Sequence, residues 1–131
     1  PNDLDKILNV IHQMESSGGT NSVPRFEPAF LERYKNAPLM KKLISTYGAR
    51  DAASSFGPYQ IMLLKAHEMG FNYSPQELSD PVKNKEVAQK IVSGLISKGL
   101  AVKDVFKRYN GGGKMADRYS QKAMKLYNTS K

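Results

Sequence analysis

Apolar positions recur at helical spacing along most of the chain, and glycine or proline interrupts them at short intervals. Near the start they fall at Leu4, Leu8 and Ile11, a spacing of four and three that places them on one helix face. We predict a first helix from Asp3 to Ser16, ended by the Ser-Ser-Gly-Gly run that overlaps its last residue. Glu15 continues this spacing, so a carboxyl group occupies a position where the pattern predicts an apolar side chain.

Prolines and glycines divide the middle of the chain. Pro28 and Pro38 suit the first turn of two further helices, and Gly48 suits the residue that follows a helix. The small residues of 49–57 predict a loop, and the apolar pattern of 58–70 predicts a helix that begins at its proline. These breaks indicate short helices joined by short loops.

The second half of the chain has the clearest helix signals. Residues 74–77 match a capping box, and the Asp-Pro pair that opens 80–99 predicts the start of a long helix. Helical patterns continue over 102–109 and 115–127, and strand alternation is lacking except for a short hairpin that we place between residues 18 and 26. We therefore predict a mainly α fold with at most a small β-hairpin.

The composition is that of a globular protein. A length of 131 residues fits one domain spanning 1–131, and 40% apolar with 24% charged residues argues against disorder. The sequence has no apolar run long enough to span a membrane. It has no cysteine, and its two histidines form no metal-binding pattern, so we expect no disulfide, no metal and no cofactor.

The net charge of +8 predicts attraction to polyanions, which include nucleic acid, anionic lipid and acidic wall polymers. Charge alone does not choose among these partners, and a basic surface can also serve solubility alone. The twenty basic residues are scattered along the chain rather than gathered in one helix, and no base-reading motif is evident. We therefore expect no nucleic-acid partner.

The position of Glu15 allows two interpretations. It can be a surface acid at a fraying helix end, which is where most glutamates lie. It can also be a general acid, because burial against apolar groups raises a carboxyl pKa from near ~4.3 towards about 6. At pH 7 an unshifted glutamate is protonated only about 0.2% of the time, so general-acid chemistry depends on such burial.

Three further stretches place amides and hydroxyls beside aromatic rings: residues 56–62, 108–112 and 118–127. Such groups suit a sugar, whose faces are partly apolar and whose edges carry hydroxyl and N-acetyl groups. The candidate sugar-binding residues are Tyr59, Gln60, Tyr109, Asn110 and Tyr119. Each also has a structural interpretation, as an exposed amide, a core tyrosine or a turn-forming asparagine.

Five motifs follow one another along the chain: Glu15-Ser16, Gly57–Met62, Asp80–Asn84, Tyr109–Gly111 and Tyr119. In this order the chain resembles the lytic transglycosylases of the soluble-lytic and goose-type lysozyme group, which have a lysozyme-like fold with a cleft and cleave peptidoglycan. The resemblance implies that the substrate is the β-1,4 bond between N-acetylmuramic acid and N-acetylglucosamine. It implies that Glu15 protonates the leaving oxygen and then accepts the proton of the sugar's C6 hydroxyl, giving a 1,6-anhydro end.

The resemblance extends to substrate binding. It implies that Gln60 and Asn110 bind amide or hydroxyl groups of the sugar, that Tyr59 and Tyr109 line the cleft, and that the hydroxyl of Tyr119 bonds near Glu15. Ser16, next to the acid, either orients it or ends the helix. Pro58-Tyr59 replaces the usual Leu-Met of the family motif, which makes this wall of the cleft more aromatic.

The segment 25–48 is an insertion relative to compact family members. Its Arg25–Phe30 stretch resembles phage-type muramidases, which suggests a phage endolysin or a virion-associated enzyme. Glu27 is our candidate for a second carboxylate, which would make the protein a hydrolytic lysozyme. The alternative is that Glu27 is only a favourable charge at a helix N-terminus, directly before Pro28.

One alternative lies outside enzymes: a basic, non-enzymatic helical module that binds the cell wall or nucleic acid. On the enzyme interpretation we expect peptidoglycan strands as the partner, a monomer, and action on the wall in the periplasm or outside the cell. The sequence shows no signal-peptide pattern, so delivery would depend on a removed leader, a holin or a phage particle.

Overall fold

Helices dominate the computed structural model, which describes residues 2–111 and 113–130; about 70% of it is helical. The helices in this part of the chain are α1 (Asn2–Ser16), α2 (Pro28–Tyr34), α3 (Pro38–Tyr47), α4 (Ala49–Ala52), α5 (Leu63–Glu68), α6 (Pro75–Ser79), α7 (Pro81–Ser97), α8 (Val102–Asn110) and α9 (Gly113–Thr129). The strands are β1 (Arg25–Phe26), β2 (Ser54–Phe56) and β3 (Ile61–Met62). The predicted mainly α, lysozyme-like fold is confirmed.

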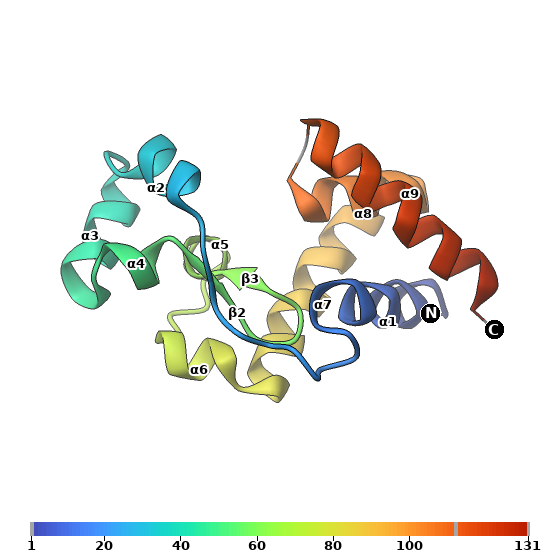
Figure 1. Cartoon of the computed structure of the whole chain (residues 1–131), viewed down its shortest axis with the longest axis horizontal. Helices are drawn as coiled ribbons and strands as arrows, with labels where there is room; N and C mark the ends of the chain where they lie inside the picture. The colour runs from blue at the N-terminus through green and yellow to red at the C-terminus, as the bar shows by residue number, and fades with distance from the viewer. Residues whose placement is uncertain (1, 112, 131) are drawn as a thin grey trace.

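The helices separate into two groups with the small sheet between them. Figure 1 shows α2, α3 and α4 on one side, α1, α8 and α9 on the other, and β2, β3 and α5 in the middle. Helix α1 packs against α7, α8 and α9, and α8 packs against α9. None of the helices in the described ranges is long and apolar enough to cross a membrane.

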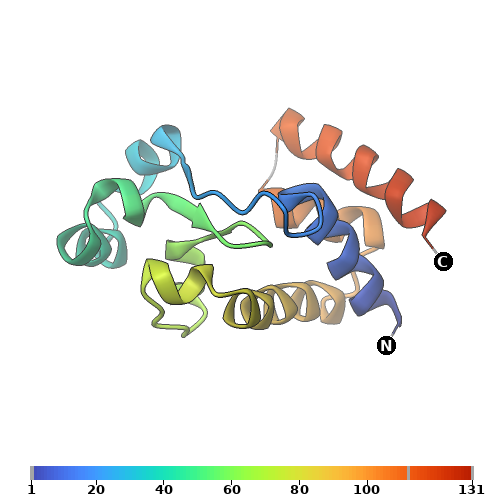
Figure 2. The same ribbon diagram turned by 60° about the horizontal axis from the view of Figure 1, so that its bottom comes forward.

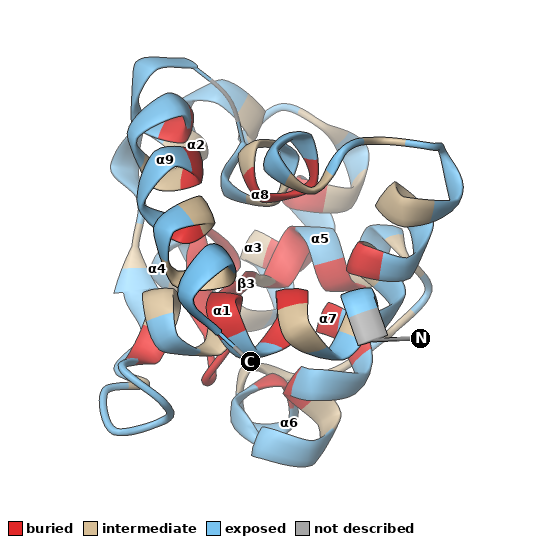
Figure 3. Cartoon of the chain, turned by 90° about the vertical axis from the view of Figure 1, so that its right-hand side faces the viewer, coloured by how far each residue is buried: buried red, intermediate tan, exposed pale blue. Residues whose placement is uncertain are grey.

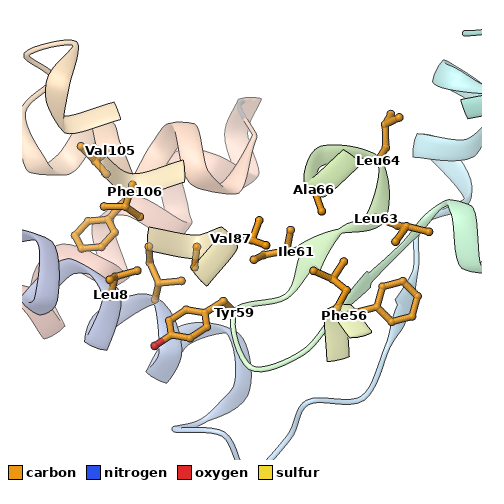
Figure 4. Packing of buried hydrophobic residues seen from close by; sticks show 14 of the residues in the cluster. Leu8, Phe56, Tyr59, Ile61, Leu63, Leu64, Ala66, Val87, Val105 and Phe106 are labelled. Carbon is orange, nitrogen blue, oxygen red and sulfur yellow. The ribbon is translucent and has the colours of Figure 1, made fainter. Parts of the chain in front are cut away.

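The core follows the apolar pattern of α1. Ile7, Leu8 and Ile11 are almost fully buried, and their side chains join the same cluster as Phe106 of α8. Figure 3 shows the inner faces of the helices buried and their outer faces exposed. In Figure 4, Leu8 and Phe106 lie close together, and the ring of Tyr59 points towards α1. The core therefore fixes the loop that carries Tyr59 against α1, the helix that carries Glu15 on its last turn.

Most of the predicted helix boundaries are confirmed. Helices α2 and α3 begin at their prolines, and Gly48 follows α3 with a φ of 89°. The capping box is complete, because the hydroxyl of Ser74 accepts from the Glu77 amide at 3.1 Å while the Glu77 carboxylate accepts from the Ser74 amide at 3.0 Å. The side chain of Asp80 caps α7 by accepting from the Lys83 amide at 3.0 Å.

The prediction for residues 49–57 was wrong, because this stretch holds α4 and β2 rather than a loop alone. The helix expected over 58–70 was also wrong at its start, since α5 begins only at Leu63. Gly57 and Gln60 both have positive φ values, 78° and 46°, and they turn the chain between β2 and β3. This tight turn, visible in Figure 2, replaces the first part of the predicted helix.

The predicted hairpin between residues 18 and 26 is also absent from the described structure. Only Arg25 and Phe26 of that segment form a strand, and β1 pairs in antiparallel fashion with β2, with Arg25 opposite Ser55. Strand β2 pairs in turn with β3, with Ser55 opposite Met62. The sheet order is β1-β2-β3, so the partner of β1 comes from about thirty residues later in the chain.

Candidate active site

Glu15 lies on the last turn of α1, and its side chain is only 14% exposed. The apolar face of the helix, which includes Leu8 and Ile11, leads directly to it. Burial raises the pKa of Glu15 above its ordinary value of 4.5, while the hydroxyl of Tyr119 and the guanidinium of Arg25 act in the opposite direction. The carboxyl group therefore sits in an environment that favours its protonated form.

Arg25 connects β1 to the end of α1. Its Nη2 donates a hydrogen bond to the backbone carbonyl of Glu15 at 2.7 Å, and its Nη1 lies 3.6 Å from Oε1 of the carboxylate. The side chain of Arg25 is 44% exposed, so water screens this ion pair. Arg25 thus positions the helix end firmly and attracts the carboxylate only weakly.

The hydroxyl of Tyr119 is buried beside Glu15. In the described part of the chain, it is the one buried side-chain nitrogen or oxygen without a hydrogen-bond partner of standard geometry. Tyr119 and Glu15 nevertheless interact: burial first, and then the Glu15 carboxylate, raise the pKa of the tyrosine far above its ordinary value of 10.0. The phenol thus remains protonated and able to donate a hydrogen bond.

The hydroxyl of Tyr109 makes a hydrogen bond within the protein. Its hydroxyl donates to the backbone carbonyl of Tyr59 at 2.7 Å, and this bond joins α8 to the turn before β3. Burial, with a smaller contribution from Glu15, raises the pKa of Tyr109 well above 10.0. Tyr109 therefore lies near the acid, but its polar atom already has a partner.

Ser16 holds the end of α1. The residue is 1% exposed, and its hydroxyl donates to the carbonyl of His12 at 3.0 Å and accepts from the amide of Gly19 at 2.9 Å. Both bonds belong to the turn that ends the helix. Of the two interpretations for Ser16, helix termination is the one that these bonds describe.

Asn84 anchors the turn that carries Tyr59. Its Oδ1 accepts from the amide of Tyr59, and its Nδ2 donates to the carbonyls of Phe56 and Leu78, each at 2.8 Å. A Cβ on Gly57 would lie 2.3 Å from the Asn84 side chain, so only glycine fits there. Gly57 and Asn84, which belong to two of the five motifs, are therefore in direct contact in the fold.

The side chain of Gln60 is also used within the protein. Its Oε1 accepts from the hydroxyl of Ser55 at 2.8 Å, while its Nε2 donates to the carbonyl of Gly57 at 2.9 Å and more weakly to that of Val23 at 3.3 Å. These bonds join the turn to the segment before β1. A direct bond from this amide nitrogen to a sugar would have to replace one of them.

A surface groove of about 580 Å³ lies between α1 and α7. His12 and Tyr59 line it, with their rings 5.0 Å apart, and Val82 and Lys85 line it from α7. Glu15 does not line this groove, because its carboxylate faces Arg25 and Tyr119 instead. Tyr59 is only 5% exposed, so little of its surface is open to a ligand.

Two candidates remain at the surface. Asn110 is exposed at the end of α8, directly before Gly111, whose φ is 126°. Glu27 is exposed at the N-cap of α2 without capping that helix through its side chain. Its amide donates to the carbonyl of Ala53 at 2.9 Å, which extends the pairing of β1 with β2 by one residue.

The described residues contain no group of three or more histidine, cysteine, aspartate or glutamate side chains arranged to hold a metal ion. The chemistry that this geometry offers is proton transfer by one partly buried carboxyl group. A protonated phenol and a guanidinium lie beside it, and both stabilise the carboxylate once its proton has left.

In a comparison with protein families, the chain matches the transglycosylase SLT domain over residues 2–129. The chain belongs to this family. As a member of the transglycosylase SLT family it is an enzyme that cleaves glycosidic bonds in peptidoglycan, and it acts on the cell wall. Searches of curated proteins and of solved structures found no significant match. The predicted family and enzyme class are confirmed.

Sequence reasoning missed the contact of Arg25 with Glu15. A buried acid at a helix end calls for a counter-charge, but twelve basic residues precede α8 and nothing in the sequence selects one of them. For Asn84 the signal was present, because it completes the Asp-Pro-x-x-Asn motif. What the motif did not reveal is that its asparagine anchors the turn before β3.

Proposed function

We propose that this SLT-family enzyme is a lytic transglycosylase in which Glu15 serves first as general acid and then as general base. The observation that carries the proposal is the surroundings of Glu15: a 14% exposed carboxyl with a raised pKa, beside the unpartnered hydroxyl of Tyr119. An acid whose pKa burial raises, and whose anion is stabilised after proton loss, suits both roles.

The reaction proceeds in two proton transfers. Glu15 donates its proton to the glycosidic oxygen as the bond from C1 of N-acetylmuramic acid to that oxygen breaks, which releases N-acetylglucosamine with a free hydroxyl. The N-acetyl group of the substrate stabilises the electron-poor C1. The Glu15 carboxylate then accepts the proton of the C6 hydroxyl, and O6 bonds to C1 to give the 1,6-anhydro product. No water is consumed, and Glu15 regains its proton.

Neighbouring residues support these steps in different ways. The hydroxyl of Tyr119 donates to the carboxylate when Glu15 is ionised, and Arg25 holds the helix end through its bond to the Glu15 carbonyl. Asn110, exposed beside a glycine, binds hydroxyl or amide groups of the sugar. Tyr59 and Gln60 shape the turn next to the substrate, and Tyr109 and Ser16 fix the elements behind the acid.

One observation favours a second candidate, hydrolysis assisted by Glu27. The chain is extended at Glu27, and exposure alternates along Arg25, Phe26 and Glu27, so the side chains of Arg25 and Glu27 point to the same face. Since Arg25 reaches Glu15 from that face, Glu27 starts about 7 Å further along the same strand direction. A carboxylate there would activate a water molecule and give a reducing muramyl end.

Product analysis separates the two reactions. Purified peptidoglycan is incubated separately with the wild type, Glu15→Gln and Glu27→Gln, and the released sugars are analysed by mass. Glu32→Gln, which changes an exposed acid, is the matched control. We expect anhydro-muramyl products from wild type, Glu27→Gln and the control, and none from Glu15→Gln. If the wild type instead produces reducing muramyl ends, and Glu27→Gln does not, the enzyme is a hydrolase and the transglycosylase proposal is wrong. Full activity of Glu15→Gln would overturn both.

The origin, assembly and route to the wall belong to this proposal too. The Arg25–Phe30 stretch supports a phage endolysin or virion-associated muramidase, delivered by a holin, a phage particle or a removed leader. We propose that the chain acts as a single-domain monomer, which light scattering of the purified protein tests directly. A stable dimer would remove that part of the proposal and leave the chemistry unchanged.

A further inference from the structure

The net positive charge is concentrated in the last two helices. From Lys98 onward the chain contains nine basic and two acidic residues, whereas residues 1–97 contain eleven basic and ten acidic ones. Basic residues are thus spread along the sequence, as the sequence analysis noted, but acids are nearly absent from its final quarter. Almost all of the +8 charge therefore belongs to the region of α8 and α9.

Four of these cations form one line along α9, which we call the basic stripe: Lys114, Arg118, Lys122 and Lys125. Their spacing of four, four and three residues places them on one helix face over about 16 Å. All four are exposed, and the buried residues of α9 lie on the other side of the helix: Ala116, Ser120 and Ala123. In Figure 1, α9 forms the outer edge of the molecule.

Helix stability does not account for the basic stripe. Like charges four residues apart destabilise a helix by about 0.2–0.5 kcal/mol per pair, and Lys114, Arg118 and Lys122 make two such pairs. The one acid in the described part of α9, Asp117, binds Lys107 of α8 at 2.8 Å. Within the described residues, no ion pair involves the basic stripe.

The basic stripe also lies close to the catalytic chemistry. Tyr119, which lies between Arg118 and Lys122 in sequence, interacts with Glu15 from the inner face of α9. The basic stripe is therefore about one helix diameter, roughly 10 Å, from the catalytic acid. A glycan strand that reaches Glu15 brings its attached groups within range of these cations, since charges interact over about 8–10 Å at physiological ionic strength.

We infer that the basic stripe is a docking surface for the carboxylate groups of the peptide stems that peptidoglycan carries on its muramic acid residues. This inference rests on the proposed function, because it takes the glycan strand at Glu15 as given. The basic stripe has no aromatic residue on which nucleic-acid bases could stack. One exposed apolar side chain, that of Met115, lies beside it, and a single side chain is much less than the broad apolar face with which a helix enters a lipid layer. Carboxylates attached to the strand being cleaved need neither.

A sedimentation assay with insoluble peptidoglycan tests this inference. All variants carry Glu15→Gln so that the wall stays intact. The basic-stripe variant changes its four cations to glutamine, and a matched control changes four exposed cations elsewhere: Arg33, Lys41, Lys42 and Lys65. At low salt we expect the basic-stripe variant to bind about tenfold or more weakly, and the control to stay within about twofold of the parent. Near 1 M salt the difference should vanish, because the screening length falls to about 3 Å.

The wall material separates the sources of negative charge. Peptidoglycan stripped of phosphate polymers should bind the parent undiminished, and blocking its stem carboxyls as amides should weaken parent binding to the level of the basic-stripe variant. Dependence on phosphate polymers instead, or equal losses in the basic-stripe and control variants, would overturn the inference. So would tighter binding of the parent to anionic vesicles or to DNA than to stripped peptidoglycan.

Cleavage of short soluble glycan fragments that lack peptide stems tests the proposed function independently of the inference about the basic stripe. With Glu15 intact, the basic-stripe variant should cleave them at the wild-type rate and unfold at an equal or higher temperature, because two repulsive pairs are gone. Failure of the wild type itself to cleave them would count against the proposed function and leave the binding result standing. Unfolding at a clearly lower temperature would show that the basic stripe serves the fold.

Discussion

The turn between β2 and β3 and the end of α1 differ in how fully their polar groups are hydrogen-bonded within the protein. In the turn, Asn84 and Gln60 each make three hydrogen bonds within the protein, and Gly57 fits where any side chain would collide. At the end of α1, the hydroxyl of Tyr119 lacks a standard partner and Glu15 is held by a 3.6 Å ion pair. The turn is built for rigidity, whereas the surroundings of Glu15 leave polar groups without close partners, as the proposed function requires.

The largest effect expected from this contrast is on activity at the acid end. Glu15→Gln should lower peptidoglycan cleavage by about 10²–10⁴-fold, because general-acid catalysis has this magnitude. Turnover is measured as released muropeptides, with Glu32→Gln retaining full activity. The contrast fails if the turn variants described below lose as much activity while still folded.

The same substitution has an opposite, pH-dependent effect on stability. Because the pKa of Glu15 is raised on folding, the wild type binds more protons folded than unfolded, so its stability falls as the pH rises through the folded pKa. Above that pKa, Glu15→Gln should unfold at higher denaturant concentration than the wild type. Well below pH 4.5 the Glu15 contribution is fully present in the wild type, and the advantage of the variant disappears.

Gly57→Ala should be the most destabilising single change in the turn. Gly57 has a φ of 78°, and the new Cβ would lie 2.3 Å from Asn84, so we expect a loss of about 3 kcal/mol or more in the free energy of unfolding. Gly94→Ala is the matched control, because nothing lies within 4 Å of its Cβ position in α7, and it should stabilise by about 0.5–1 kcal/mol. Denaturant titration measures both.

Gln60→Ala tests whether this amide serves the fold or the sugar. It leaves the Ser55 hydroxyl without its partner and removes one of the two hydrogen bonds that the Gly57 carbonyl accepts, so we expect stability to fall by about 1–3 kcal/mol. At a temperature where the variant is folded, KM should change little. A rise in KM with unchanged stability would return Gln60 to the sugar-binding role. Gln121→Ala, at an exposed position on α9, should shift stability by less than about 0.5 kcal/mol.

Tyr119→Phe should alter the pH profile more than the stability. Its hydroxyl has no standard partner, so we expect the free energy of unfolding to change by less than about 1 kcal/mol. The hydroxyl lowers the pKa of Glu15, so without it the descending limb of the activity profile should move to higher pH. Tyr127→Phe loses the 3.0 Å bond to Asp3 and should leave that limb in place.

Of these variants, Arg25→Gln should shift the pH profile of activity least. Arg25 also lowers the pKa of Glu15, but its half-exposed guanidinium is screened, so the descending limb should rise by less than about one pH unit. Arg33→Gln, at an exposed position on α2, is the control. If Arg25→Gln shifts the descending limb further than Tyr119→Phe does, the charge of Arg25 lowers the pKa of Glu15 more than the hydroxyl of Tyr119 does.

The sequence predicted those features that depend on local chemistry. Proline, glycine and capping residues placed most helix ends. The apolar spacing up to Ile11 singled out Glu15 but left open whether it is a surface acid or a partly buried one, and the structure has it 14% exposed. The sheet was missed because strands of two and three residues are too short to show alternation. The contact of Arg25 with Glu15 was missed because it depends on the pairing of β1 with β2, far along the chain.

The bonding of the motif residues was beyond the sequence for a different reason. A positive φ can be anticipated at Gly57, but nothing in the sequence indicates one at Gln60, where it is rare. That conformation turns the amide of Gln60 back towards Gly57 and Ser55. The roles proposed for Ser16, Tyr59, Tyr109 and Asn110 in binding or catalysis stay predictions, as does that of Glu27, which the product analysis addresses.

The bonds of Asn84 also set an order of assembly. This one side chain joins Phe56, Tyr59 and Leu78 to α7, so its partners are separated from it by as many as 28 residues. The ring of Tyr59 packs in the core, but the polar groups of the turn between β2 and β3 are satisfied only once Asn84 has arrived, and closing so long a loop precedes any gain from these bonds. We therefore expect the turn to be among the last segments to order during folding. A chain still emerging from the ribosome would then lack a finished active site until α7 has been made and has docked.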